Sequence, residues 1–189
     1  RRHTNFSMEA VAQTFSGNQA VGSRVSSTIS RNGDLISKMY YEFNPVAIVP
    51  NAGGNNIAAN LGHAIFNEIE LEIGGQRIDK HYGHWLTVLN MLTESNPLAT
   101  KGAITGNGIQ PATCTKYAEL SYTHYPRQQA GQTTAGAPVK AFVPFQFWFN
   151  RNPGLALPLI ALQYHEVKVN ITFATAANLC TNNGVIDPA

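Results

Sequence analysis

The chain has 189 residues, of which 43% are hydrophobic and only 13% are charged, and its formal net charge is +2. This hydrophobic content excludes a disordered chain, and a charged fraction well below the usual ~25% leaves a surface covered by uncharged polar side chains or by partners. Basic residues form no cluster beyond Arg1 and Arg2. No sequence-specific nucleic-acid binding is therefore expected.

The cysteines and the chain ends indicate the cellular setting. Cys114 and Cys180 show no metal-site or disulfide-framework spacing, which indicates a reducing compartment. No apolar run approaches the ~18 residues of a membrane span, and no signal-peptide pattern opens the chain. Because the first residue is Arg1 rather than methionine, we expect a fragment of a longer protein.

The first predicted element in chain order is a β-hairpin. Arg24–Ser30 and Leu35–Phe43 are strand-like segments that flank Asn32-Gly33. An Asn-Gly pair supplies the positive φ angles that a tight hairpin turn requires, so the two segments are expected to pair with each other.

A second hairpin is predicted from Asn67–Ile73 and Gln76–His81, joined by Gly74-Gly75. In the first of these segments, apolar residues alternate with glutamates, as in a half-buried strand. The glutamates, Glu68, Glu70 and Glu72, are expected to form a solvated face or a contact for a partner's basic groups. Arg77 and Asp79, two residues apart, are expected on one strand face, where a local ion pair is possible.

One helix is predicted, because Trp85, Val88, Leu89 and Leu92 fall at helical spacing before Pro97. Segments rich in Gly, Asn, Thr and Gln predict loops on both sides of it. These segments are Asn51–Asn60, Glu94–Gln110 and Gln128–Pro138.

The segment Phe142–Phe149 predicts a strand that is apolar on nearly both faces, which requires cover on both sides. Phe145, Phe147 and Phe149 are expected in the core between two sheets, while Trp148 faces the other way. A turn with Pro153 and Gly154 follows at Asn150–Gly154, and Glu166–Phe173 is a further alternating strand.

About eight strands, short hairpins, one short helix and long loops predict an all-β sandwich, and the natural eight-stranded choice is a jelly roll. Residues 1–189 are expected to form a single domain of this kind. Because jelly rolls serve as capsid shells, lectins and cupins, the fold alone does not select a function.

Catalytic and metal-binding patterns are weak. His81 and His84 have a possible metal-ligand spacing, with His63, His124, His165 or Glu166 as candidate third ligands. The His-x-His pair of a cupin is absent, so hydrogen bonding at a strand–helix corner is the preferred interpretation. No nucleophile motif or phosphate loop occurs. We expect no catalytic, cofactor or metal site, and no enzyme.

Four blocks of the sequence together resemble the major capsid protein of the nucleocytoplasmic large DNA viruses, which include iridoviruses and phycodnaviruses. They are Arg1–Glu9, Ser27–Ile36, Glu70–Trp85, and Phe147–Phe149 with Arg151–His165, and they occur in the family's order.

The resemblance implies two tandem jelly rolls per subunit, of which this chain holds the first and lacks the second. It also implies homotrimeric, pseudo-hexagonal capsomers in the outer shell of an icosahedral virion assembled in the host cytoplasm. Partners would be neighbouring capsomers and minor capsid proteins, and the resemblance allows an inner membrane beneath the shell. Residues expected to serve as structural core or interface are Phe145, Phe147, Phe149, Trp148, Trp85, Pro153 and Gly154, with Trp148 facing the second jelly roll or a neighbour.

Two alternatives stay open from the residues alone. A lectin-like or receptor-binding jelly roll would hold sugar with polar loops such as Asn51–Asn60. A cupin-type metalloenzyme would use His81 and His84.

Overall fold

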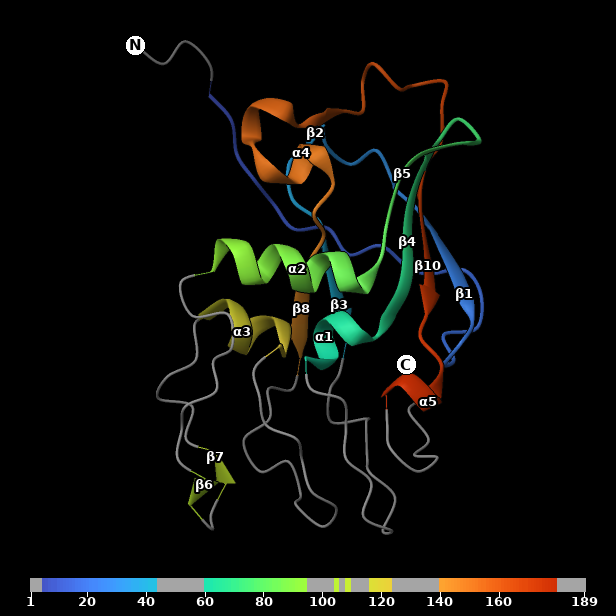
Figure 1. Ribbon diagram of the computed structural model, residues 1–189. Helices are drawn as coiled ribbons and strands as arrows, with labels where there is room; N and C mark the ends of the chain where they lie inside the picture. The colour runs from blue at the N-terminus through green and yellow to red at the C-terminus, as the bar shows by residue number, and fades with distance from the viewer. Residues whose placement is uncertain are drawn as a thin grey trace.

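The structure is a computed structural model that describes residues 5–43, 60–94, 104–105, 108–109, 116–123 and 140–179. Its largest sheet has four antiparallel strands in the order β1 (Arg24–Thr28), β10 (Val167–Phe173), β4 (Phe66–Ile73) and β5 (Gln76–His81) (Figure 1). Three antiparallel pairs complete the strands: β2 (Leu35–Ile36) with β9 (Leu157–Pro158), β3 (Tyr40–Phe43) with β8 (Ala141–Pro144), and β6 (Ile104–Thr105) with β7 (Gly108–Ile109).

The strands and helices differ in number from those expected. Ten strand segments are described rather than eight. The helices are α1 (Leu61–Ala64), α2 (Gly83–Thr93), α3 (Lys116–Ser121), α4 (Trp148–Arg151), α5 (Ala176–Leu179) and the 3-10 turn η3 (Pro153–Leu155). Only α2 matches the predicted helix, so the expectation of a single helix is wrong. The other helices have four to six residues, too few to produce a helical period in the sequence.

The β4–β5 hairpin is confirmed. Gly74 and Gly75 have φ angles of +60° and +81°, which match the two positive angles of a type I′ turn. The strands on either side begin and end within one residue of the predicted bounds.

The first predicted hairpin is wrong. β1 pairs with β10, Val25 facing Ile171, while β2 pairs with β9. Neither Asn32 nor Gly33 has a positive φ, so their turn is not the primed type that folds a strand back on its neighbour. β1 instead pairs with β10, a strand more than a hundred residues later in the sequence. The segment between β1 and β2 leads the chain to the other layer.

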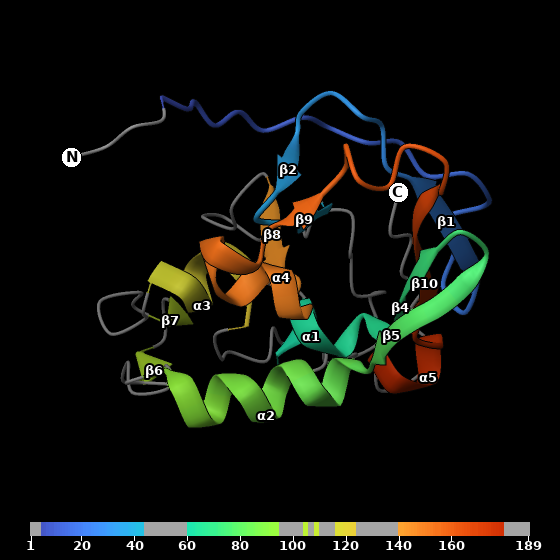
Figure 2. The same cartoon turned by 90° about the horizontal axis from the view of Figure 1, so that it is seen from above.

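Two layers enclose the core, as seen from above in Figure 2, with the four-stranded sheet on one side and the β3–β8 and β2–β9 pairs on the other. Aromatic rings cross between the layers. The ring centroid of Tyr41 lies 5.1 Å from that of Phe66 and 5.9 Å from that of Phe173. The ring centroids of Phe66 and Phe145 are 6.0 Å apart. Burial of these rings supplies much of the apolar free energy that holds the sandwich together.

The predicted strand Phe142–Phe149 is shorter in the structure. β8 ends at Pro144, which faces Tyr40 of β3. Because Tyr40 is the first residue of β3, β8 has no partner strand beyond this point. One further bond, from the Phe145 amide to the Met39 carbonyl (2.9 Å), follows before α4 begins at Trp148. Residues 145, 147 and 149 nevertheless remain buried, so the alternation of burial outlasts the strand.

Helix α2 packs closely on α1 and the start of β4. A Cβ at Gly83 would lie 2.2 Å from the His63 carbonyl oxygen and 2.5 Å from that of Phe66, so only glycine allows this approach. Leu86 is buried beneath the helix. Of the apolar residues whose spacing predicted this helix, Trp85, Val88 and Leu92 are exposed.

Candidate functional site

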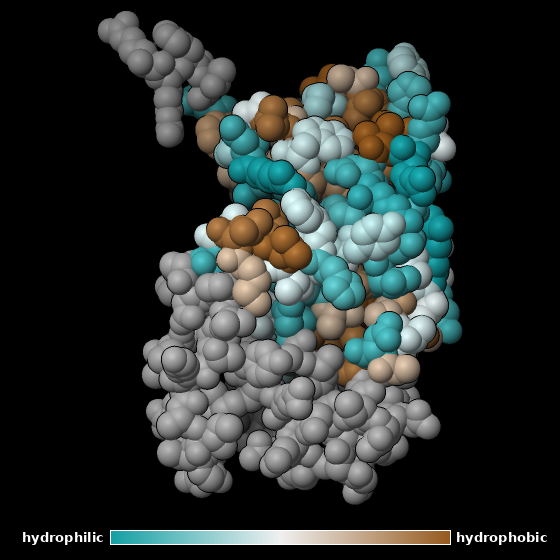
Figure 3. Space-filling model, viewed as in Figure 1, coloured by the Kyte–Doolittle hydropathy of each residue, from teal (hydrophilic) through white to brown (hydrophobic). Residues whose placement is uncertain are grey.

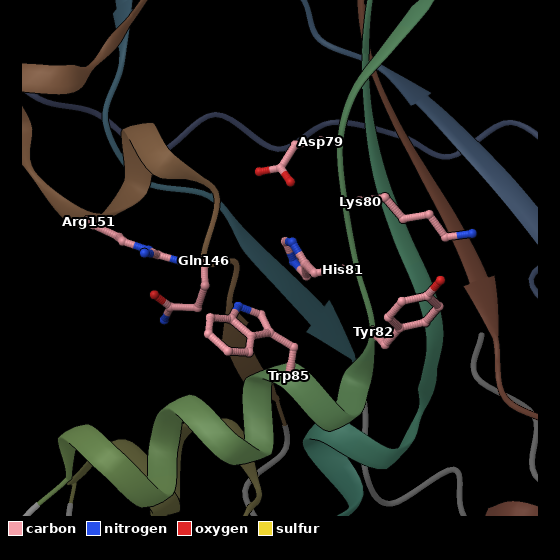
Figure 4. A pocket seen from close by; sticks show the side chains of 7 residues that line it. All are labelled: Asp79, Lys80, His81, Tyr82, Trp85, Gln146 and Arg151. Atoms are coloured by element: carbon pink, nitrogen blue, oxygen red, sulfur yellow. The ribbon is translucent and has the colours of Figure 1, made fainter.

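A pocket of about 400 Å³ opens between the end of β5, the first turn of α2 and the segment that leads into α4 (Figure 4). Its lining residues are Asp79, Lys80, His81, Tyr82, Trp85, Gln146 and Arg151. Within the lining, the side chains of Asp79, His81, Trp85, Gln146 and Arg151 gather on one side of β5, while those of Lys80 and Tyr82 point to the other side. The first five form the inner wall of the pocket.

An irregularity in β5 places two of these side chains in the pocket. Arg77 faces Glu72 across the ladder and Asp79 faces Leu71, so Ile78 is an extra residue with no partner on β4. Such a bulge reverses the alternation of side chains on its strand. Asp79 therefore joins His81 on the inner face, while Arg77 lies on the outer face.

The expected Arg77–Asp79 ion pair does not form, because the bulge places the two side chains on opposite faces of β5. Arg77 instead bonds Glu70, with Nη1 to Oε1 at 3.1 Å. Within the described ranges, Asp79 forms no ion pair. Strict alternation in the sequence gives no sign of the bulge. Sequence reasoning also missed Asp79, Gln146 and Arg151 as pocket residues, because only the tertiary structure brings these distant segments together.

His81 is the innermost polar group of the pocket, with only 6% of the residue exposed. Its ring centroid lies 4.7 Å from that of Phe147. The pKa of His81 is lowered to about 4, chiefly by burial, while the Asp79 carboxylate opposes this shift and the Arg151 guanidinium adds to it. The ring is thus neutral at pH 7. Its buried Nε2 has no hydrogen-bond partner in the described part of the chain.

Arg151 and Asp79 give the pocket one charge of each sign. Neither forms an ion pair with any described residue. Lys80, in contrast, is engaged on the outer face, with its Nζ 2.8 Å from Glu68 Oε1 and 5.2 Å from the ring centroid of Tyr82. The pocket therefore presents unpaired groups that donate and accept hydrogen bonds, beside the indole of Trp85.

The glutamate stripe of β4 meets basic groups of its own chain. Glu70, with 8% of its side chain exposed, accepts from Arg24 at 2.6 Å and from Arg77 at 3.1 Å, and Lys80 lies 3.7 Å away. Glu72 accepts from Asn170 at 3.1 Å. The basic groups that contact Glu70 are thus supplied by β1 and β5 of the same chain.

The residues expected to form core or interface fall into three groups. Phe145, Phe147 and Phe149 are buried. Trp148 and Trp85 are 37% and 38% exposed, at the starts of α4 and α2. Pro153 and Gly154 lie exposed in η3, where Asn152 Oδ1 accepts a 2.8 Å bond from the Gly154 amide. The contact of Trp148 with another unit stays a prediction.

The candidate metal ligands do not converge. His63 lies among α1, α2 and α3, with Nε2 3.0 Å from the Tyr117 hydroxyl and Nδ1 3.3 Å from Thr87 Oγ1, and burial lowers its pKa to about 4. His84 is exposed. Among the described residues, no group of three His, Cys, Asp or Glu side chains could hold a metal ion. His124 and residues 51–59 of the proposed sugar-binding loop lie outside those ranges.

One face of α2 adds an apolar surface beside the pocket. Trp85, Val88, Met91 and Leu92 are all at least a third exposed. Figure 3 shows hydrophobic side chains gathered over the C-terminal half of this helix. No described helix is both long and apolar enough to cross a membrane.

The sequence matches the family model described as "Major capsid protein N-terminus" over residues 1–187. This chain belongs to that family. It is 45% identical over 184 residues to the major capsid protein of Pyramimonas orientalis virus. This match covers 97% of this chain and 42% of that protein. It is 37% identical over 184 residues to the major capsid protein of Paramecium bursaria Chlorella virus 1, with coverage of 97% and 36%.

Solved structures agree with this assignment. The crystal structure of PBCV-1 VP54, fitted into a cryo-EM reconstruction of the virophage Sputnik, matches with a TM-score of 0.70 and 34% identity. The quasi-atomic model of the PBCV-1 virus capsid matches with a TM-score of 0.69 and 34% identity. Each match covers 100% of this chain and 40% of the other. The resemblance to the capsid proteins of large DNA viruses and the jelly-roll capsid fold are thus confirmed, and the chain spans less than half the length of these relatives.

Proposed function

We propose that residues 1–189 are one jelly-roll domain, the first of two in tandem, of a structural protein that forms trimeric, pseudo-hexagonal capsomers. Three such subunits would tile the outer shell of an icosahedral large DNA virus after assembly in the host cytoplasm. The partners are other subunits of the same protein, neighbouring capsomers and minor capsid proteins. The protein is not an enzyme.

The observation that carries this proposal is the match to major capsid proteins over nearly the whole chain. Their greater length leaves room for a second jelly roll, because this chain covers 42% or less of the relatives described above. The similarity to the PBCV-1 capsid model supports a place in a shell.

The exposed apolar side chains fit an assembly surface. Trp148 on α4 and the face of α2 that carries Val88, Met91 and Leu92 expose large apolar side chains. Aromatic side chains are enriched in the centres of protein interfaces, where they lose contact with water. Trp148 is assigned to a contact with the second jelly roll or a neighbouring subunit, while Phe145, Phe147 and Phe149 serve the core.

The test uses the complete polypeptide that contains this chain. Native mass spectrometry of the purified protein is expected to show a trimer, and electron microscopy is expected to show particles with a pseudo-hexagonal outline. A protein that stays monomeric at high concentration would overturn the proposal.

A further inference from the structure

The inner wall of the β5–α2 pocket contains more unpaired polar groups than packing requires. Asp79 and Arg151 have no ion pair among the described residues, and the largely buried ring of His81 closes the inner end of the pocket. Polar groups without a partner in the protein are ordinarily satisfied by water, a ligand or a partner chain. In Figure 4 the side chains of Asp79, Gln146 and Arg151 surround the same space as the His81 ring.

The charges of the inner wall limit the kind of ligand. An anion would lie near the Asp79 carboxylate, and a cation would lie near the Arg151 guanidinium. With one charge of each sign, the wall favours neither. A purely apolar ligand would cover the polar side chains of Asp79, Gln146 and Arg151 without giving them hydrogen bonds. The fitting ligand is therefore neutral and carries both donors and acceptors.

Hydroxyl groups satisfy this requirement most fully, because each one donates one hydrogen bond and accepts others. A hydroxyl can donate to Asp79 while its neighbour accepts from Arg151. Another can pair with the side-chain amide of Gln146. The indole of Trp85, 38% exposed at the rim, offers an apolar surface for the C–H groups of a sugar ring.

We propose that the β5–α2 pocket binds one or two units of a neutral saccharide, with Asp79, Gln146 and Arg151 bonding its hydroxyls and Trp85 covering one ring face. The volume of about 400 Å³ lies within the range of small-ligand pockets. A side chain from a neighbouring subunit is the rival occupant. An asparagine or glutamine amide would pair with two of these groups, whereas a row of hydroxyls pairs with all of them.

The experiment titrates the 189-residue chain with the methyl glycosides of glucose, galactose, mannose and N-acetylglucosamine. Saturation-transfer NMR detects binding, and the chemical-shift changes of the chain's amide signals during the titration give the dissociation constant. A ligand with so few atoms is expected to bind with a dissociation constant of about 1 mM. At least one glycoside of the panel should reach saturation.

Two variants and one matched control test the location. Trp85→Ala should weaken binding at least about tenfold, and Asp79→Asn, which keeps the shape but removes the charge, about three- to tenfold. Trp148→Ala is the control, because Trp148 is the same residue type, is 37% exposed and does not line the pocket. It should bind as the unaltered chain does. Amide spectra of all three confirm that each variant is folded.

Three outcomes would overturn the proposal. One is that no glycoside saturates the chain at concentrations up to about 100 mM, a hundredfold above the expected dissociation constant. Another is that Trp85→Ala binds as tightly as Trp148→Ala. The third is that Asp79→Asn leaves glycoside binding unchanged but weakens trimers of the complete polypeptide, which would assign the pocket to a subunit contact. Saccharide binding is measured without assembly, so its failure leaves the capsomer proposal standing.

Discussion

The turn residue Gly74 lies directly against the ring of His165. A Cβ at Gly74 would come within 2.6 Å of His165 Nδ1, and the Gly74 amide donates a 2.8 Å bond to the carbonyl of Glu166. The β4–β5 hairpin is thereby joined to the loop that leads into β10. The tip of the hairpin is held in place even though it projects beyond the sheet.

Replacing Gly74 by alanine is expected to destabilise the protein by about 1–3 kcal/mol. The alanine must adopt a φ of +60°, and its methyl group collides with the imidazole of His165. Urea denaturation measures the loss. Gly33→Ala is the matched control, because φ there is not positive and no atom lies within 4 Å of the new methyl group. Equal stability of the two variants would contradict the assigned turn.

The buried carboxylate of Glu70 is expected to matter more than an exposed one. Glu70→Gln removes the charge that faces Arg24, Arg77 and Lys80, and the expected loss of unfolding free energy is about 1–3 kcal/mol. Glu42→Gln breaks the Glu42–Lys140 pair, in which both side chains are about half exposed, and should change stability by at most about 0.5 kcal/mol. Thermal melts at low and high salt compare the two. If Glu42→Gln is the more damaging change, the Glu70 network is not structural.

Acid is expected to destabilise the protein through its two buried histidines. Burial lowers the pKa of His63 and His81 to about 4, from 6.5 in the unfolded chain. Between these values the unfolded state binds more protons, so the free energy of unfolding is greatest above about pH 6.5 and falls as the pH drops toward 4. For each histidine the loss between pH 7 and pH 4.5 is about 2 kcal/mol.

Comparing variants isolates this effect from the titration of the carboxylates. The difference in unfolding free energy between pH 7 and pH 4.5 should shrink in His81→Asn by about 2 kcal/mol. It should be unchanged in His84→Asn, because His84 is exposed. The same pH dependence in both variants would show that His81 is not held neutral by its surroundings.

Substitutions at Trp148 and Phe147 are expected to have different effects, the first on trimer formation and the second on the stability of the fold. Trp148→Ala should weaken the trimer of the complete polypeptide while changing the melting temperature little, because this side chain is partly exposed. Phe147→Ala should instead cost about 3–5 kcal/mol of stability, since Phe147 is fully buried between Phe145 and Phe149. Analytical ultracentrifugation and calorimetry measure the two effects. A Trp148→Ala variant with normal trimers and a normal melting temperature would remove Trp148 from the interface.

Local sequence signals predicted those parts of the fold whose causes are local. Gly74-Gly75 predicted a turn with positive φ angles, and the alternation in Asn67–Ile73 and Glu166–Phe173 predicted β4 and β10. The helical spacing near Trp85 predicted α2. The blocks of family resemblance predicted the capsid family, which the comparisons confirm.

Only the tertiary structure decided which partner each element meets. Asn32-Gly33 has the composition of a hairpin turn, but β1 gains more by pairing along its whole length with β10 than with two-residue β2. The apolar stripe of α2 has the right period, yet Gly83 brings the opposite face onto α1 and leaves Trp85 outside. The bulge at Ile78 places Arg77 on the opposite face from Asp79 and His81, which line the pocket. Local patterns set the conformation of a segment, while pairing depends on which distant surfaces bury the most apolar area together.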